Sequence, residues 1–422
     1  MTHPITFEGS EVIEPQKRKH TLLMFRLENR LSSTASQSLQ TSYAKQKGDQ
    51  PYYMEEFTSY DIDYQINMQL DFAQLDLGAN YSYNKTPFDE SEYLNSEHDI
   101  DRIKKYAAFA QASFTLIEDE LDVILGEKFE HNNLTGWEQQ PSIRFAWHLD
   151  NSHFLWASFS KGVRTPSLLE YDYNIQVNGL KIKSVFETGH ELIDTTRIKT
   201  FLRGNNQLQS EKIASTELGY RINHNTWNAD LSVFYSETKN ALSITPEADP
   251  LLIPTVVTLL QSANIIGFSQ YIQTQTANLN LNSDGKQRTY GGDFILNWQV
   301  NPSANMTFGI SYAKQEEYLA QNELLDFNGE TKQVFFDLNK KINEKHNIMF
   351  QSRWEDGSIY KTDNFIAVDM SWKWQYNNKL SIQLTGNNLL EKNHVEYART
   401  NDIFDVATYI ERSFSLGLMV DL

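Results

Sequence analysis

The side chains that could carry chemistry in this chain do not combine into a recognisable catalytic set. The tightest pairs of histidine and acid are His190 with Glu191 and His394 with Glu396. Two histidines without a third ligand do not form a zinc site, and the chain has no cysteine. No serine nucleophile elbow, phosphate-binding glycine loop or HExxH segment occurs. We therefore predict no enzymatic activity, no catalytic residue, no metal and no cofactor.

Ligand capture by cationic and aromatic side chains is the other chemistry that the sequence offers. Two long connections between predicted strands, 163–211 and 238–287, contain such residues. Cations and aromatic rings suit an anionic, partly aromatic ligand. In the first connection the candidate ligand-binding residues are Arg164, Tyr171, Tyr173, Arg197 and Arg203, and Lys199 and Phe201 lie between the last two. In the second connection the candidate is Tyr271. For Arg164 we favour a charge pair with Glu170 that orients the loop.

Composition limits the classes of partner and of membrane anchor. The 422 residues include 37 basic and 55 acidic side chains, which gives a net charge of −18. Because phosphate binding relies on clustered Lys and Arg, nucleic acid is not an expected partner. No apolar run approaches the ~20 residues of a transmembrane helix; the longest, residues 251–260, contains Pro254. The N-terminus has no secretory signal pattern.

Alternation of apolar and polar residues is the dominant pattern from about residue 20 to the end. In residues 60–70 every even position is apolar or aromatic and every odd one is Asp, Asn or Gln. This period of two predicts strands with one apolar face, and helical spacing is nearly absent. Most runs span about ten residues, enough to cross a bilayer at a tilt, whereas soluble strands average about five or six. Aromatic residues near the strand ends fit an interfacial girdle: Trp147, Trp227, Trp298, Trp372, Trp374 and Tyr376.

The connections between the predicted strands alternate between short and long. Short turns are expected at 32–34, 71–74, 117–120, 150–152, 224–226, 301–304, 343–346 and 377–379. Longer links are expected at 46–53, 85–104, 131–137, 163–211, 238–287, 317–331, 356–363 and 392–406, and residues 267–281 could form an extra hairpin arm. Outer-membrane barrels have short periplasmic turns and long extracellular loops. The pattern predicts an all-β fold, a transmembrane antiparallel β-barrel with about 17 strands.

Three segments carry motifs beyond those of a generic barrel. Residues 158–167 end a strand in a basic, proline-containing loop start, residues 206–221 lead through Glu211 into Glu-Leu-Gly-Tyr, and residues 386–397 contain Asn-Asn-Leu-Leu. In this order and spacing they resemble the C-terminal barrel of TonB-dependent outer-membrane receptors. The matching residues, with structural roles, are Arg164, Pro166, Glu211, Glu217, Gly219, Asn387, Asn388 and Leu389. We expect Asn387 and Asn388 to satisfy hydrogen bonds, and Glu217 to face a wet lumen.

The resemblance also implies a domain organisation. The family's barrel has 22 strands, so five strands and the N-terminal plug would be missing from this chain. The first and last strands would then run in the same direction. Residues 1–20 would be an N-terminal segment, part of an extracellular loop, and residues 21–422 an incomplete barrel. The chain ends in Leu422, where the family usually has an aromatic residue.

The function implied by the resemblance is that of an active-transport receptor in the outer membrane of a Gram-negative bacterium. Its ligand would be a ferric siderophore or a similar scarce nutrient. Its partners would be membrane lipid, a small-molecule or metal-chelate ligand and, through the plug, the TonB energy-coupling complex. Two alternatives stay open: a plugless pore or non-functional remnant, and a soluble β-sandwich binding protein whose core holds the aromatic residues.

Overall fold

The structure is a computed structural model. It describes residues 5–7, 10–12, 17–49, 54–87, 94–181, 197–248, 251–262, 264–274, 276–318, 329–356, 363–401 and 404–420.

Seventeen strands form a wall in which each is antiparallel to the next. They are β3 (Arg18–Arg30), β4 (Ala35–Asp49), β5 (Met54–Gln69), β6 (Gln74–Lys85), β8 (Arg102–Ile117), β9 (Leu121–Asn132), β10 (Gly136–His148), β11 (His153–Arg164), β14 (Glu211–Asn223), β15 (Trp227–Ala248), β16 (Thr276–Asn301), β17 (Ala304–Tyr318), β18 (Gly329–Lys341), β19 (His346–Glu355), β20 (Phe365–Gln375), β21 (Leu380–Asn387) and β24 (Ser413–Val420). The expected all-β barrel fold is confirmed, and the wall has the seventeen strands expected; three further strands join the same sheet at one end.

The apolar residues of this wall lie on its outer face. On β15 the side chains of Leu231, Val233 and Tyr235 are 50%, 48% and 45% exposed. A soluble sandwich would bury that face against a second sheet, so the sandwich alternative is wrong. The alternation seen in the sequence therefore separates an apolar exterior from a polar interior.

Aromatic residues line this exterior at two heights. Trp227 lies opposite Trp298 near the short turns, and Tyr235 lies opposite Tyr290 towards the other end. The eight residues from Trp227 to Tyr235 span roughly 26 Å along the strand, and less across the bilayer because barrel strands are tilted. The two rows have the spacing of interfacial girdles around an apolar band.

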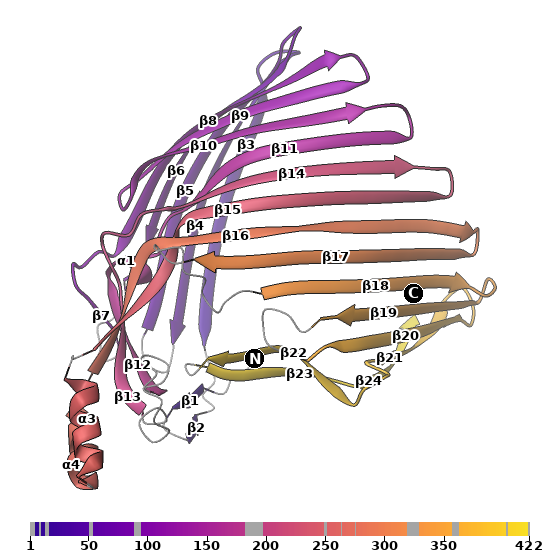
Figure 1. Ribbon diagram of the computed structural model, residues 1–422. Coiled ribbons are helices and arrows are strands. Elements are labelled where there is room, and N and C mark those ends of the chain that lie inside the picture. Colours follow the sequence, from indigo (N-terminus) through magenta and orange to yellow (C-terminus); the bar gives the residue numbers. More distant parts are fainter. Residues whose placement is uncertain are drawn as a thin grey trace.

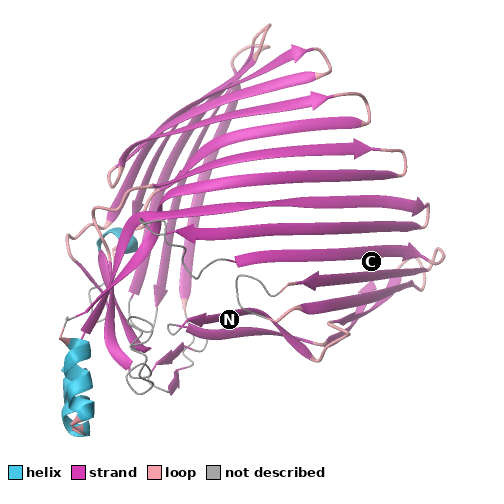
Figure 2. Ribbon diagram, in the orientation of Figure 1, coloured by secondary structure: helices cyan, strands magenta, loops and turns pink. Residues whose placement is uncertain are grey.

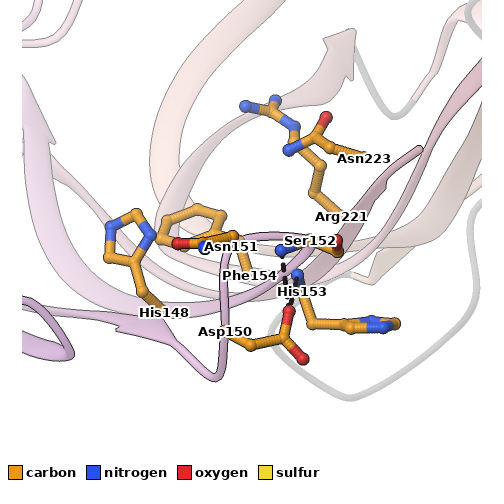
Figure 3. A pocket seen from close by; sticks show the side chains of 8 residues that line it. All are labelled: His148, Asp150, Asn151, Ser152, His153, Phe154, Arg221 and Asn223. Atoms are coloured by element: carbon orange, nitrogen blue, oxygen red, sulfur yellow. Dashed lines mark hydrogen bonds between the residues drawn. The ribbon is translucent and has the colours of Figure 1, made fainter. Parts of the chain in front are cut away.

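All eight predicted short turns are present, at one end of the wall (Figure 1). Several are closed by an Asn or Asp side chain that accepts backbone N–H groups two and three residues ahead, a local preference of these residues. In the turn after β10, Asp150 accepts from Ser152 (2.7 Å) and His153 (2.9 Å), as the dashed lines in Figure 3 mark. The N–H of Ser152 is the main cause of a lowered pKa at Asp150.

A pocket of about 200 Å³ beside this turn is lined by His148, Phe154, Arg221 and Asn223 as well as by turn residues (Figure 3). Arg221 is paired with Asp230 at 2.5 Å.

Two of the expected long links are different in the structure. Only Asn133 to Thr135 separate β9 from β10, because the Asn132 carboxamide accepts the N–H groups of Leu134 and Thr135 and closes a tight turn. The hairpin arm expected at 267–281 is wrong as well. That segment contains part of the helix α4 (Ile265–Thr274), which follows the helix α3 (Leu252–Gln261), and the start of β16.

The helices α3 and α4 form because their apolar residues have helical spacing that the strand pattern masks. Leu252, Val256 and Ile272 are buried together against Leu279 at the start of β16. Within the described residues no helix is long and apolar enough to cross a membrane.

The opposite end of the wall carries the remaining elements (Figures 1 and 2). These are β1 (Ile5–Phe7), β2 (Ser10–Val12), β7 (Leu94–Ser96), α1 (Leu168–Asp172), β12 (Tyr173–Lys181), β13 (Arg197–Arg203), β22 (Asn393–Asn401) and β23 (Phe404–Glu411). We call this the loop end. β3 begins at Arg18, slightly earlier than the expected boundary at residue 21.

β3 and β24 are the first and last strands of the wall. Because seventeen strands alternate in direction, β3 and β24 point the same way, as expected. β3 pairs with β4 and β24 pairs with β21, and no ladder joins β3 to β24 among the described residues. Every residue of β3 and β24 is exposed, so these two end strands have the least covered surface of the wall.

Candidate functional site

Arg164, at the end of β11, joins the first two sequence motifs. Its Nε and Nη2 donate to the two carboxylate oxygens of Glu211 at 2.7 and 2.9 Å, and its Nη1 donates to Glu170 at 3.0 and 3.1 Å. A forked guanidinium suits such paired contacts. The charge pair with Glu170 that was expected from the sequence is present. Ligand contact by Arg164 stays a prediction.

Glu211 lies five residues beyond Thr216, which pairs with the girdle residue Tyr235, and is thus outside the apolar band. Burial raises the pKa of Glu211, but hydrogen bonds from Arg164 and from the N–H of Leu242 outweigh it. The net pKa of this carboxyl is therefore lowered, and it stays ionised.

Glu170 also fixes the start of α1. Its carboxylate accepts the N–H of Ser167 at 2.8 Å, and its own N–H donates to the Ser167 hydroxyl at 3.2 Å. This capping box satisfies two N–H groups that a helix leaves open. Pro166 precedes it in the chain. The proline and serine of the first motif therefore serve to turn the chain into α1.

Asp172, at the end of α1, is the most heavily bonded carboxylate of the loop end. Its side chain is fully buried. It accepts the N–H of His98 (2.9 Å) and of Ile100 (3.0 Å), the hydroxyl of Ser96, and the ring Nδ1 of His98 (2.8 Å). Asn206 in turn contacts His98 Nε2 at 3.1 Å. Three loops are thus tied to one carboxylate, and no sequence signal marks it because its partners lie more than 70 residues away.

Replacing Asp172 with asparagine should loosen residues 94–100 without unfolding the barrel. An amide has one acceptor oxygen and places its NH₂ against donors, which costs about 1–2 kcal/mol for a buried site. We expect faster hydrogen exchange in residues 94–100 and unchanged exchange in the wall strands. Unchanged exchange in residues 94–100 would contradict the role given to Asp172.

The predicted tyrosines mainly support the loop end. Tyr171 donates its hydroxyl to the carbonyl of Leu134 at 3.2 Å, and burial, followed by the charge of Asp172, raises its pKa. Tyr173 is 4% exposed and packs with Leu94 and Leu168. Tyr271 packs against the cluster of α3 and α4. The structure does not bring Tyr271 together with Tyr171 and Tyr173, and their contact with a ligand stays a prediction.

A small sheet stands on the loop end. β7, β12 and β13 pair in succession, and β13 pairs in parallel with the start of β16. We call this the loop sheet. Its apolar face carries Leu202 and Leu279, which pack with α3. Parity and register put the following side chains on the other face: Asn95, Asn174, Gln176, Lys199, Phe201, Arg203, Asn278 and Asn280.

This polar face holds a cationic centre. Lys199 and Arg203 are exposed on β13, and the Lys199 ammonium lies 5.4 Å from the centroid of the Phe201 ring. In the described part of the chain neither cation has a carboxylate at ion-pair distance. Arg197 is the first residue of β13 and pairs with Lys181 in the ladder. Of the predicted ligand-binding residues, Arg203 is the one whose side chain is exposed on this polar face, with Lys199 and Phe201 on the same strand.

The remaining motif residues have structural positions. Gly219 lies under the indole of Trp156, where a Cβ would be 2.2 Å from the ring. Glu217 is exposed and shares the face of Gly219, opposite to that of the outward Leu218, which is 47% exposed. This agrees with a lumen-facing Glu217.

The third motif turns the chain at the end of β21. Asn388 has a φ of 51°, a region that Asn tolerates better than most residues. Its N–H donates to Asp369 at 2.7 Å and its side chain to the carbonyl of Ile410 at 3.0 Å. Asn387 donates to the Ser413 hydroxyl at 3.1 Å, and the N–H of Leu389 to the carbonyl of Val368 at 2.8 Å. The two asparagines thus make the hydrogen bonds expected of them.

No group of three His, Asp or Glu side chains converges as metal ligands among the residues that the structure describes. The contacts at the loop end are those of a scaffold that holds loops, with one exposed cationic strand.

The comparisons with known proteins agree on the fold. The family model described as "TonB dependent receptor-like, beta-barrel" matches residues 19–389. No curated protein matches the chain.

Several solved structures resemble the chain over nearly its whole length. The siderophore receptor PirA from Pseudomonas aeruginosa has a TM-score of 0.68 at 14% identity, with 95% of this chain and 64% of that chain covered. A variant of the ferric enterobactin receptor PfeA from the same organism has 0.64 at 12%, with 99% and 72% covered. The copper transporter OprC has 0.64 at 12%, with 96% and 67% covered. The chain therefore spans less than two thirds of the length of PirA.

Proposed function

The chain belongs to the TonB-dependent receptor-like β-barrel family, and from that premise we propose that it forms the barrel of an outer-membrane uptake receptor in a Gram-negative bacterium. Its ligand would be a ferric siderophore or a similar metal chelate. Its barrel would contact membrane lipid, and a plug domain would couple it to the TonB complex.

The observation that carries this proposal is the difference between the two ends of the wall. One end has short turns, and the other has α1, the loop sheet and the α3–α4 pair, held by polar contacts around the buried Asp172 and the half-exposed Arg164. Surface loops on a rigid scaffold are where binding residues concentrate. An exposed cationic strand at that end suits an anionic ligand.

Uptake of radiolabelled iron tests the proposal. We expect cells that carry the gene to take up ⁵⁵Fe given as ferric enterobactin or as ferric citrate, and a deletion strain to lose that uptake. A protonophore should abolish it, because coupling through TonB uses the proton gradient. Uptake that continues with the protonophore, or steady ion conductance of the protein in a planar bilayer, would favour the pore alternative. No difference between the strains for either chelate would contradict the proposal.

A further inference from the structure

The polar face of the loop sheet carries two kinds of group that a ligand could bind: exposed cations and, in the described part of the chain, carboxamide oxygens without a donor. Lys199 and Arg203 are exposed cations without a carboxylate partner in the described residues, and they require acceptors. Beside them, the carboxamide oxygens of Asn174 and Asn278 are covered and have no hydrogen-bond donor among the residues that the structure describes. A covered acceptor without a partner is unfavourable, so a ligand that supplies the donor recovers free energy.

The strand register places the cations and the carboxamides close together. Asn174 lies directly opposite Arg203, and Asn278 lies beside Phe201, between the two cations. Neighbouring strands are about 4.8 Å apart, and Lys199 and Arg203 are separated by roughly 13 Å along β13. Both Asn174 and Asn278 are partly exposed. Rotation of the Asn278 amide brings its oxygen to the surface, whereas the Asn174 amide is held by the hydrogen bonds that it donates to Asn95 and Glu97.

We propose that the polar face of the loop sheet binds a hydroxylated polycarboxylate, whose carboxylates pair with Lys199 and Arg203 and a hydroxyl of which donates to the carboxamide of Asn278. This proposal rests on the proposed function and names the chemical class of its ligand. A simple anion without hydroxyl groups would satisfy the cations only.

Neighbouring charges set the limits of the site. Glu97 accepts from Asn174 at 2.9 Å, and Glu247 accepts from Asn280 at 2.8 Å. Both carboxylates lie at the margins of the face, on either side of β13. They would repel a polyanion that extended sideways, so the ligand is expected to lie along β13. The ring of Phe201 holds the Lys199 ammonium above the sheet, in position to meet a carboxylate.

Two sources supply this chemistry: a ferric hydroxycarboxylate and an acidic oligosaccharide. Binding of ferric citrate, of metal-free trigalacturonate, and of tricarballylate, which is citrate without its hydroxyl, would be measured by calorimetry on the purified full chain in detergent. We expect one of the first two probes to bind saturably and tricarballylate to bind at least tenfold more weakly. Preference for ferric citrate identifies a chelate site, and preference for trigalacturonate a sugar site.

Variants decide whether the proposed face is responsible. The double change Lys199→Gln with Arg203→Gln should weaken the preferred probe at least tenfold, and Asn278→Leu should abolish its advantage over tricarballylate. Lys379→Gln, an exposed cation in a turn at the opposite end, is the matched control and should bind like wild type. Heat-modifiable gel migration checks that each variant is folded.

The proposal is overturned if neither hydroxylated probe binds, if tricarballylate binds equally well, or if the double variant binds like wild type. Iron uptake separates this outcome from failure of the proposed function. Uptake that survives in the double variant leaves the receptor function standing without this site. Probe binding without any uptake keeps the site and removes the transport function.

Discussion

Replacement of Gly291 with alanine is expected to destabilise the folded barrel by at least about 3 kcal/mol. A Cβ at this position would lie 2.0 Å from the carbonyl oxygen of Tyr312 and 2.9 Å from the Cα of Ala313, both on the neighbouring strand β17. Overpacking costs about 1–3 kcal/mol when side chains can move. Here the obstacle is backbone, so the ladder between β16 and β17 must separate.

The test of Gly291→Ala is urea unfolding from lipid vesicles, followed by heat-modifiable migration on gels. Gly417→Ala on β24 is the matched control, because its Cβ would meet only Gln383, at 3.9 Å. We expect the control to fold like wild type. If both variants have the same unfolding midpoint as wild type, the close approach of β16 and β17 at Gly291 is wrong.

Replacement of Arg164 with alanine is the second large effect, and we expect a loss of about 2–3 kcal/mol. The change leaves Glu170 and Glu211 side by side without their shared cation. Breaking a buried ion pair costs about 3–5 kcal/mol. The guanidinium side chain is 43% exposed, and solvent screening reduces that figure, since exposed pairs contribute about 0–1 kcal/mol.

The loss at Arg164 should be concentrated at the loop end. Hydrogen exchange is expected to rise in α1 and at the start of β14, while the short turns keep their protection. Arg164→Lys should restore only part of the hydrogen-exchange protection of α1 and β14. An ammonium lacks the planar fork with which the guanidinium donates to both oxygens of Glu211 and to Glu170. A lysine variant as protected as wild type would mean that charge alone holds the loop.

Much of the wall could be predicted because its signals are local. Alternation in residues 60–70 depends only on the strand's own geometry. The turn at Asp150 follows from an Asp that bonds to N–H groups two and three residues ahead. The two links predicted wrongly, 131–137 and 238–287, depend on more than alternation. Asn132 shortens the first, and helix packing around Val256 builds the tip of the second.

Some residues of the candidate site could likewise be predicted from the sequence, and others could not. Arg164, Glu170 and Glu211 could be singled out from the sequence because motif residues and opposite charges mark them. Tyr173 could not be told from a ligand-binding tyrosine, because only packing shows that it is buried.

The sequence alone therefore determined the seventeen strands of the wall, its short turns and its apolar exterior, since each follows from residues within one strand or one turn. The tertiary structure decided the rest. Asp172 gains its role only when chain folding brings His98 and Ser96 to it. The polar face around Arg203 exists only because β13 pairs with β16, a contact between segments more than 70 residues apart. Interactions over such separations depend on the path of the whole chain, which no local pattern specifies.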